Sequence, residues 1–328
     1  MARISFGLDL GSTSTKYVAM QDGKILYKHR LPTGWSSKEA SYNVKEDLIK
    51  NGFSFDDFRC VSTGYGRVSV DYANKNITEI TCHAKGAEYL FNEREVAIID
   101  IGGQDTKIIV LEDGQVKDFI MNDKCSAGTG RFLEVMANAM GYDPASLCEL
   151  ARKGKGVKIS SMCTVFAESE VIGLAGAGTP KEDIAFGIVE SITEKVVSQC
   201  RNVPEDFKVF LTGGLCGCPY ILESLSDKLG RKVETHEVAM YAGAIGAAVC
   251  RENEIKNLLK RLSHKDKIYY ILCKLILMWQ PIHLFKTIKS LNTGIKQWSH
   301  FFGYIFKSAF GNHSNETKYS LLYSKNLI

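Results

Sequence analysis

Two stretches of this chain repeat each other and decide its fold: FGLDLGSTSTKYVAMQDGKI at residues 6–25 and AIIDIGGQDTKIIVLEDGQV at residues 97–116. They align without a gap, 91 positions apart, and share six identical residues. The identical pairs are Asp9 with Asp100, Gly11 with Gly102, Thr15 with Thr106, Lys16 with Lys107, Asp22 with Asp113, and Gly23 with Gly114. Each copy has the pattern of an apolar strand ending in Asp, a tight turn with Gly, a second strand, and an Asp-Gly turn into a third strand. Two such copies, each followed by helical stretches, predict a duplicated α/β fold whose two glycine turns face each other across a cleft.

The segments around the two copies alternate between helical and strand-like patterns. Apolar periodicity predicts helices over 40–51, 81–91, 131–140, 165–174, 182–201 and 239–249. Short strands are predicted at 59–62 and 208–212, and the second leads into Gly213 and Gly214. We therefore expect a first lobe formed by residues 1–95, to which residues 236–250 return, and a second lobe formed by residues 96–235.

The charge of the chain is divided unevenly along its length. Residues 1–250 carry 28 Lys and Arg against 33 Asp and Glu, whereas residues 251–328 carry 13 against 4. This basic, aromatic C-terminal extension includes an apolar stretch at 268–279 that is shorter than the ~20 residues needed to span a bilayer. Its role stays open between an appendage, a docking segment for a partner, and contact with a membrane surface. The acidic first 250 residues and the lack of a recognised module argue against nucleic-acid binding.

The N-terminus and the cysteines together indicate a reducing compartment. No signal-peptide pattern is present, because Asp9 interrupts the first apolar stretch and no small-residue cleavage site follows. We therefore expect a cytoplasmic protein. There, the ten cysteines are expected to be buried thiols, metal ligands or redox groups rather than disulfides.

The glycine turns have the composition of phosphate-binding loops. Backbone N–H groups can approach a phosphate closely only where no side chain intervenes, and nearby hydroxyls and a lysine add donors and positive charge. The candidate nucleotide-binding residues are Asp9, Gly11, Ser12, Thr13, Ser14, Thr15, Lys16, Asp100, Gly102, Gly103, Gln104, Thr106, Gly213 and Gly214. Asp9, Asp100 and Asp105 are candidate ligands for the Mg²⁺ that accompanies a nucleotide triphosphate. The candidate catalytic residues are Gln104 and Asp105, which would orient the attacking water, and Lys16. There is no GxxxxGK[ST] motif, so the site is not a P-loop.

Three of these motifs resemble a known superfamily. DLGSTSTK at 9–16, DIGGQDTK at 100–107 and LTGG at 211–214 are similar to the two phosphate motifs and the adenosine motif of the actin, Hsp70 and sugar kinase ATPases. This resemblance implies a duplicated actin-like, ribonuclease H-like α/β fold with two lobes around a nucleotide cleft.

Longer motifs resemble one narrower family within it. NDKCSAGTGRFLE at 122–134 and SSMCTVFAESEVI at 160–172, with GYGR at 64–67 and TCHAKGA at 81–87, are similar to the ATP-dependent activators of 2-hydroxyacyl-CoA dehydratases. That family also includes ATPase subunits of benzoyl-CoA reductase. The stretch LCGCP at 215–219 and the C-terminal extension depart from the family pattern. The first departure concerns the adenine contacts.

Cys125 and Cys163 are the candidate metal ligands, because both family motifs centre on them. The resemblance implies a [4Fe–4S] cluster, which needs four thiolates where one chain offers two. A twofold dimer supplies the other two, so one cluster is expected per homodimer. Each cysteine precedes a predicted helix, whose N-terminus favours negative charge.

The remaining candidate ligands are expected to have structural roles. Cys216 and Cys218 lack the second pair that a metal site of closely spaced cysteines requires. The other cysteines are expected to be core thiols: Cys60, Cys82, Cys148, Cys200, Cys250 and Cys273. His83 is expected to be packed or at an interface, and Glu168 and Glu170 to form salt bridges or interface contacts.

The resemblance implies an ATPase that couples hydrolysis to delivery of one low-potential electron from the cluster to a dehydratase or reductase component. A reduced ferredoxin or flavodoxin would recharge the cluster, which implies an anaerobic, oxygen-sensitive protein. The alternatives are a subunit of a benzoyl-CoA reductase-like enzyme, a small-molecule kinase of the same superfamily, and a regulatory protein with a degenerate nucleotide site. A kinase would need a substrate pocket with a catalytic Asp and would have no use for Cys125 or Cys163.

Overall fold

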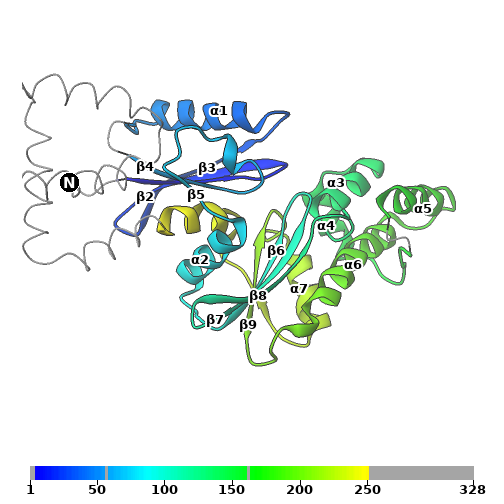
Figure 1. Cartoon of the computed structure of the whole chain (residues 1–328). Coiled ribbons are helices and arrows are strands. Elements are labelled where there is room, and N and C mark those ends of the chain that lie inside the picture. Colours follow the sequence, from blue (N-terminus) through cyan, green and yellow to red (C-terminus); the bar gives the residue numbers. More distant parts are fainter. Residues whose placement is uncertain (1–3, 56–57, 161–162, 251–328) are drawn as a thin grey trace, which may run out of the picture. The chain divides into compact units, whose positions relative to one another are not determined.

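The computed structural model describes residues 4–55, 58–160 and 163–250, which form two mixed five-stranded sheets (Figure 1). The strand order is β3-β2-β1-β4-β5 in the first sheet and β10-β9-β6-β7-β8 in the second. The C-terminal extension, together with everything expected of it, lies outside the described residues.

Each copy of the repeat forms the antiparallel half of one sheet, as predicted. The strands are β1 (Ser5–Leu10), β2 (Ser14–Gln21) and β3 (Lys24–Pro32) in the first sheet, and β6 (Val96–Ile101), β7 (Thr106–Glu112) and β8 (Gln115–Asn122) in the second. Both Asp-Gly turns have positive φ at their two central residues, 52° and 76° at Asp22 and Gly23, and 54° and 71° at Asp113 and Gly114. This is the backbone conformation that two-residue hairpins favour.

The other half of each sheet is parallel. β4 (Arg59–Thr63) pairs with β1, and β9 (Lys208–Gly213) pairs with β6 in the equivalent place. Two-residue strands complete the edges, β5 (Lys75–Asn76) and β10 (Val233–Glu234). In both sheets the central strand therefore lies between an antiparallel and a parallel neighbour.

The predicted helices are confirmed to within a few residues, and two more are present. The helices are α1 (Ser37–Lys50), α2 (Glu79–Phe91), α3 (Gly130–Ala139), α4 (Pro144–Ala151), α5 (Thr164–Gly176), α6 (Lys181–Gln199), α7 (Pro219–Leu229) and a helical stretch at 242–250. Single 3₁₀ turns lie at Arg67–Ser69, Cys200–Asn202 and Ala239–Tyr241. The unpredicted helices α4 and α7 are short, and each begins at a proline, which favours the first helical position. No described helix is both long and apolar enough to cross a membrane.

Helices cover both sheets, and α2 contacts both of them. One face of the first sheet packs against α1 through Val44 and Leu48, and the other face packs against residues 242–250. One face of the second sheet is covered by α3 to α7 (Figure 1). Cys82 of α2 packs with Val61 of the first sheet, and Ala84 of α2 packs with Ile98 of the second. The first turn of α2 is thereby held where β1 and β6 end. The lobe boundaries given above stay predictions.

Candidate functional site

The site is built around the two aspartates of the repeat. Asp9 near the end of β1 pairs in register with Lys16 of β2, and Asp100 of β6 pairs in the same way with Lys107 of β7. Both aspartate side chains are buried. Identical sequence positions thus place an Asp–Lys pair at the end of each central strand.

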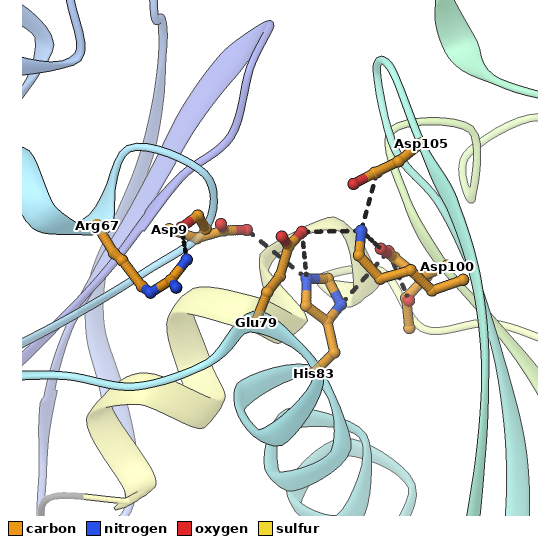
Figure 2. Close-up of polar contacts among 9 residues, drawn as sticks. Asp9, Arg67, Glu79, His83, Asp100 and Asp105 are labelled. Atoms are coloured by element: carbon orange, nitrogen blue, oxygen red, sulfur yellow. Dashed lines mark hydrogen bonds and ion pairs between the residues drawn. The ribbon is translucent and has the colours of Figure 1, made fainter. Parts of the chain in front are cut away.

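Helix α2 adds two residues between these aspartates. Glu79 is its first residue and His83 lies one turn later, so both side chains point the same way (Figure 2). His83 Nδ1 is 3.4 Å from Asp100 Oδ1, and His83 Nε2 is 3.8 Å from both Asp9 Oδ2 and Glu79 Oε1. The buried imidazole therefore stands between the two copies of the repeat.

Lys107 ties three carboxylates together beneath the second glycine turn. Its Nζ lies 2.8 Å from Asp105 Oδ1, 2.9 Å from Glu79 Oε1 and 3.3 Å from Asp100 Oδ2 (Figure 2). The lysine side chain is fully buried. A buried ammonium group is tolerated only when it is paired in this way.

The two aspartates differ in charge balance although their sequence contexts match. Burial would raise the pKa of Asp100, but His83 and Lys107 beside it outweigh burial and lower that pKa to about 2. Burial raises the pKa of Asp9, and Lys16 offsets only part of that rise. Burial would lower the pKa of Lys107, but the surrounding carboxylates, Asp100 foremost, raise it above its ordinary value.

The three glycine turns come together at this cluster. A Cβ at Gly103 would collide with the side chain of Thr13, so the two repeat turns touch. Gly213 has φ +85°, and a Cβ there would lie 2.7 Å from Asp100 Oδ1. The Gly214 N–H donates to the carbonyl oxygen of Ile101 at 2.9 Å. The two repeat turns therefore touch each other, and the third turn lies against the end of β6 and the Asp100 carboxylate.

Two predicted nucleotide ligands have their hydroxyls engaged within the protein. The hydroxyl of Thr15 shares a hydrogen bond of 2.9 Å with that of Thr33, and the Thr106 hydroxyl donates to the carbonyl oxygen of Gly128 at 2.6 Å. Both threonines are fully buried. We interpret them as supports of the loops rather than as direct phosphate ligands.

Of the other predicted nucleotide and catalytic residues, Asp9, Asp100 and Gly213 are buried, and the rest are accessible. Thr13, Gln104 and Gly214 are exposed, whereas the following residues are half-buried: Gly11, Ser12, Ser14, Lys16, Gly102, Gly103 and Asp105.

Cys125 and Cys163 lie on neighbouring loops, and both are exposed. The two loops are joined through the residue that follows each cysteine, because the hydroxyls of Ser126 and Thr164 are hydrogen-bonded at 2.6 Å. Cys163 is the N-cap of α5, as predicted. Cys125 precedes α3 by a turn at 126–129, in which the Thr129 hydroxyl donates to Ser126 O, and α3 begins at Gly130, one residue before the predicted start.

The cysteine loops are hydrogen-bonded to the second glycine turn. The N–H groups of Gly130 and Arg131, at the start of α3, donate to the carbonyl oxygens of Gly102 and Gly103 at 2.9 and 2.8 Å. The hydrogen bond from the Thr106 hydroxyl to the carbonyl oxygen of Gly128 also joins the second copy of the repeat to the loop of Cys125. A continuous set of hydrogen bonds therefore runs from the carboxylate cluster to the loop of Cys125 and, through Ser126, to that of Cys163.

Helix α5 exposes an apolar surface directly after Cys163. Val165 and Phe166 are each 67% exposed and Ile172 is 58% exposed. Such a surface next to two exposed thiols is typical of a protein interface.

The competing cysteine pair does not form a joint site. Cys216 and Cys218 are both buried, and they have different partners: Cys216 hydrogen bonds with Thr235, and Cys218 with Cys148 of α4. Cys60, Cys82, Cys148 and Cys200 are also buried, Cys250 is partly buried, and Cys273 lies outside the described part of the chain.

Glu170, which was expected to form a salt bridge or an interface contact, accepts hydrogen bonds from Ser160. The Ser160 hydroxyl donates to Glu170 Oε1 at 3.0 Å.

Glu79 and Lys107 were not predicted to be site residues, and His83 was expected to be packed or at an interface. Lys107 carried a usable signal, since it aligns with Lys16. His83 is buried as expected, but at the centre of the site. Its role depends on where α2 lies between the sheets, which no local pattern reveals.

Comparisons with known proteins agree with this architecture. A model of the BadF/BadG/BcrA/BcrD ATPase family matches residues 6–250. The (R)-2-hydroxyglutaryl-CoA dehydratase activating ATPase of Acidaminococcus fermentans is 40% identical over 253 residues, which span 76% of this chain and 97% of that protein. The solved structure of the activator of the 2-hydroxyisocaproyl-CoA dehydratase from Clostridium difficile with bound ADPNP has a TM-score of 0.74 at 35% identity and covers 80% of this chain and 98% of that one.

A more distant structure shares the fold alone. A ROK family glucokinase from Streptomyces griseus, in complex with glucose and AMPPNP, has a TM-score of 0.51 at 12% identity and covers 76% of this chain and 99% of its own. The fold is thus the duplicated actin-like ATPase fold that the repeat and its motifs predicted.

Proposed function

This chain belongs to the BadF/BadG/BcrA/BcrD ATPase family, and from that membership and the site geometry we propose that it activates a 2-hydroxyacyl-CoA dehydratase. In this proposal ATP hydrolysis is coupled to the delivery of one low-potential electron to the dehydratase component. The observation that carries the proposal is the set of hydrogen bonds that joins the glycine turn at Gly102–Gly103 to the loops of Cys125 and Cys163.

The nucleotide would be held by the glycine turns of the two copies. Backbone N–H groups around Gly11 and Gly102 bind phosphates, and Gly213–Gly214 faces the adenosine. Asp9, Asp100 and Asp105 bring the oxygen ligands that Mg²⁺ prefers. The tight approach of Gly103 to the Thr13 side chain supports this assignment, because it brings the two repeat turns together.

Hydrolysis would depend on groups from both copies. Gln104 is exposed and Asp105 is half-buried, so both can reach a water molecule beside the terminal phosphate. Lys107 orients Asp105 through its 2.8 Å contact, and Lys16 offers positive charge from β2 of the first copy. Positioning and electrostatic stabilisation account for most of the catalysis of phosphoryl transfer.

The thiols of Cys125 and Cys163 fit half of a [4Fe–4S] site. They are exposed, they lie on hydrogen-bonded loops, and α5 exposes apolar side chains beside them. A second copy related by a twofold axis would supply the other two thiols and cover that apolar surface. When bound, such a cluster supplies one-electron chemistry at low potential.

The coupling would run through α3 and the Ser126–Thr164 bond. Because Gly130 and Arg131 donate to the carbonyl oxygens of the glycine turn, a movement of that turn on nucleotide binding moves the start of α3. The loop of Cys125 precedes α3 and is bonded to the start of α5, so the same movement alters the surroundings of both cysteines. Cluster potentials respond to hydrogen bonding and exposure. A ferredoxin or flavodoxin is the proposed electron donor.

The proposal is tested by iron and sulfide analysis of the anaerobically purified protein. The wild type should be a dimer with about four irons in total, as four thiolate ligands require. Cys125→Ser and Cys163→Ser should each lose the iron, whereas Cys216→Ser should keep it. A monomer with a full cluster, or undiminished iron in Cys125→Ser, would contradict the bridging site and favour a small-molecule kinase of the same fold.

A further inference from the structure

The charged cluster contains buried polar atoms that make no hydrogen bond. Asp9 Oδ1 and both ring nitrogens of His83 are in this state, although each residue is only 3% exposed. Leaving buried polar atoms unsatisfied is costly, and an unsatisfied group in a native protein calls for an explanation such as a bound ion. The imidazole is aimed at two carboxylates at distances longer than a hydrogen bond, 3.4 Å to Asp100 and 3.8 Å to Asp9.

Three of the side chains present ligand atoms to a common point. Asp9 Oδ2, Glu79 Oε1 and His83 Nε2 all lie within 4.8 Å of one another, and His83 Nε2 is 3.8 Å from each of the two oxygens. With metal–ligand bonds of about 2.1 Å, the donors of an octahedral site are about 3.0 Å apart when adjacent and about 4.2 Å apart when opposite. The two separations of 3.8 Å from His83 Nε2 fall between these values, so shifts of less than about 1 Å would bring these donors to the adjacent spacing, and water would fill the other positions.

A glycine keeps the space beside these atoms free. Gly243 belongs to the helical stretch at 242–250, and a Cβ on it would lie 2.6 Å from Asp9 Oδ2 and 2.8 Å from His83 Nε2. Any other residue would place carbon next to two of the three ligand atoms. The absence of a side chain at Gly243 avoids this clash with both atoms.

The charges around the position favour a cation. Asp9, Glu79, Asp100 and Asp105 contribute four carboxylates, beside which stand the ammonium groups of Lys16 and Lys107. The neighbouring guanidinium of Arg67 donates to the carbonyl oxygen of Gly64 at 3.1 Å (Figure 2). Lys107 pairs with Asp100, Asp105 and Glu79, and the Glu79 Oε1 that it contacts is the oxygen that faces His83 Nε2, so the ammonium group and the ion would share this oxygen.

We propose that Asp9, Glu79 and His83 bind a divalent transition metal ion of the Mn²⁺ or Fe²⁺ class in the absence of nucleotide. One imidazole nitrogen with two carboxylate oxygens suits such ions better than Mg²⁺, which prefers oxygen ligands alone. The nitrogen ligand distinguishes this site from the Mg²⁺ set of Asp9, Asp100 and Asp105 that accompanies a nucleotide. The inference needs neither the iron–sulfur cluster nor the dehydratase partner, so it stands or falls separately from the proposed function.

The ion would fasten α2 to the first sheet. Asp9 lies on β1, whereas Glu79 and His83 lie on the first two turns of α2. A ligand that binds only the folded state raises its stability according to its concentration and affinity. Mn²⁺ should therefore raise the unfolding temperature of the metal-free wild type.

The test is a titration of the full-length, chelator-treated protein with Mn²⁺ alone, followed through the electron paramagnetic resonance signal of the free ion. We expect one bound Mn²⁺ per chain, with nitrogen coupling from an imidazole in pulsed spectra. His83→Ala should abolish the nitrogen coupling and weaken binding about 100-fold or more, since loss of mere supporting residues already costs about 10–100-fold. Mg²⁺ should displace Mn²⁺ only at a concentration at least about ten times higher.

Matched variants separate the site from general effects. Gly243→Ala removes no ligand and should weaken Mn²⁺ binding as strongly as Glu79→Gln. His29→Ala, at an exposed histidine, and Glu88→Gln, at a carboxylate of the same helix, should bind like the wild type. Circular dichroism of each variant checks its folding. If His83→Ala does not fold, the Mn²⁺ affinities of Glu79→Gln and Gly243→Ala decide whether the site exists.

The proposal is overturned if Mn²⁺ binds only after ADP is added, because the ion is then the counter-ion of the nucleotide. It is equally overturned if the bound ion shows no nitrogen coupling, or if folded Glu79→Gln and Gly243→Ala bind Mn²⁺ within twofold of the wild type.

Discussion

The two copies of the repeat share their strand order, their turns and their Asp–Lys pair, yet they balance charge in opposite ways. In the second copy Lys107 is fully buried among three carboxylates, and the pKa of Asp100 is lowered to about 2. In the first copy Lys16 is only half-buried, and burial raises the pKa of Asp9. The duplicated sequence therefore produces the same backbone in both copies, whereas the residues packed around each copy determine the burial of its lysine and the pKa of its aspartate.

The same contrast appears in packing. Gly7 of β1 occupies the position that Ile98 occupies in β6. The glycine lets the backbone of residues 242–250 lie directly on the first sheet, whereas Ile98 packs against the side chains of α2. One strand position thus admits a close backbone contact and the other a hydrophobic side chain.

The largest effect should come from removing one proposed catalytic group from each copy. Lys16→Ala and Asp105→Ala should each lower the ATP hydrolysis rate about 10²–10³-fold, the cost typical of losing one group that stabilises the transition state. Iron content should not change, because the thiols are separate from the cleft. Lys24→Ala, at an exposed lysine of β3, is the control and should hydrolyse ATP normally. Loss of iron with ATPase activity retained would show that the cleft is wrongly assigned.

The next effect separates the two lysines by stability. Lys107→Met leaves buried carboxylates without their partner and should lower the free energy of unfolding by about 3–5 kcal/mol. Lys16→Met should cost less than about 1 kcal/mol, since its ammonium group is partly solvated. Both values come from denaturant unfolding at pH 7, with Lys117→Met in an exposed ion pair as the reference. Equal losses of unfolding free energy in Lys16→Met and Lys107→Met would contradict the difference in burial between the two lysines.

A smaller effect is expected at Gly7. A Cβ there would collide with the carbonyl oxygen of Ala244 and lie 2.7 Å from the nitrogen of Ala248. Gly7→Ala should therefore lower the free energy of unfolding by about 1–3 kcal/mol, as overpacking does. Gly217→Ala is the matched control, because a Cβ at that residue meets nothing within 4 Å. Thermal unfolding of both variants gives the comparison, and an unchanged Gly7→Ala protein would show that residues 242–250 can move away from β1.

The smallest effect concerns Tyr17, which aligns with Ile108 in the second copy. The hydroxyls of Tyr17 and Tyr27 donate to Asp47 Oδ2 at 2.6 and 2.8 Å. Partial burial opposes ionisation of Asp47, but these two hydrogen bonds outweigh it and lower its pKa. Tyr17→Phe should cost at most about 1 kcal/mol at pH 7, because Asp47 is partly exposed to solvent.

The pH dependence of that cost follows from the sign of the shift. A lowered pKa stabilises the fold above the ordinary value of about 3.9, and this stability is lost as the pH falls through the folded-state value. The stability difference between wild type and Tyr17→Phe should therefore shrink below about pH 4. A difference that is constant between pH 7 and pH 3 would mean that the hydroxyl acts through packing alone.

The backbone of both sheets and most helices could be predicted because their signals are local. Asp22–Gly23 and Asp113–Gly114 fix two hairpins through positive φ angles, and strands and helices follow from short periodic patterns. The helices α4 and α7, each of which begins at a proline, were not predicted. The start of α3 was predicted to within one residue.

The sequence by itself determined the duplication, the phosphate-loop composition, Cys125 and Cys163 as a candidate pair, and the membership that these motifs imply. Only the tertiary structure decided which charges meet. Glu79 and His83 reach Asp9 and Asp100 because α2 lies between the two sheets, and Gly86 and Gly246 allow its backbone to touch that of residues 242–250. The physical reason is range: turn and strand preferences act over a few residues, whereas the pKa of a buried carboxylate depends on every charge that packing brings within several ångströms.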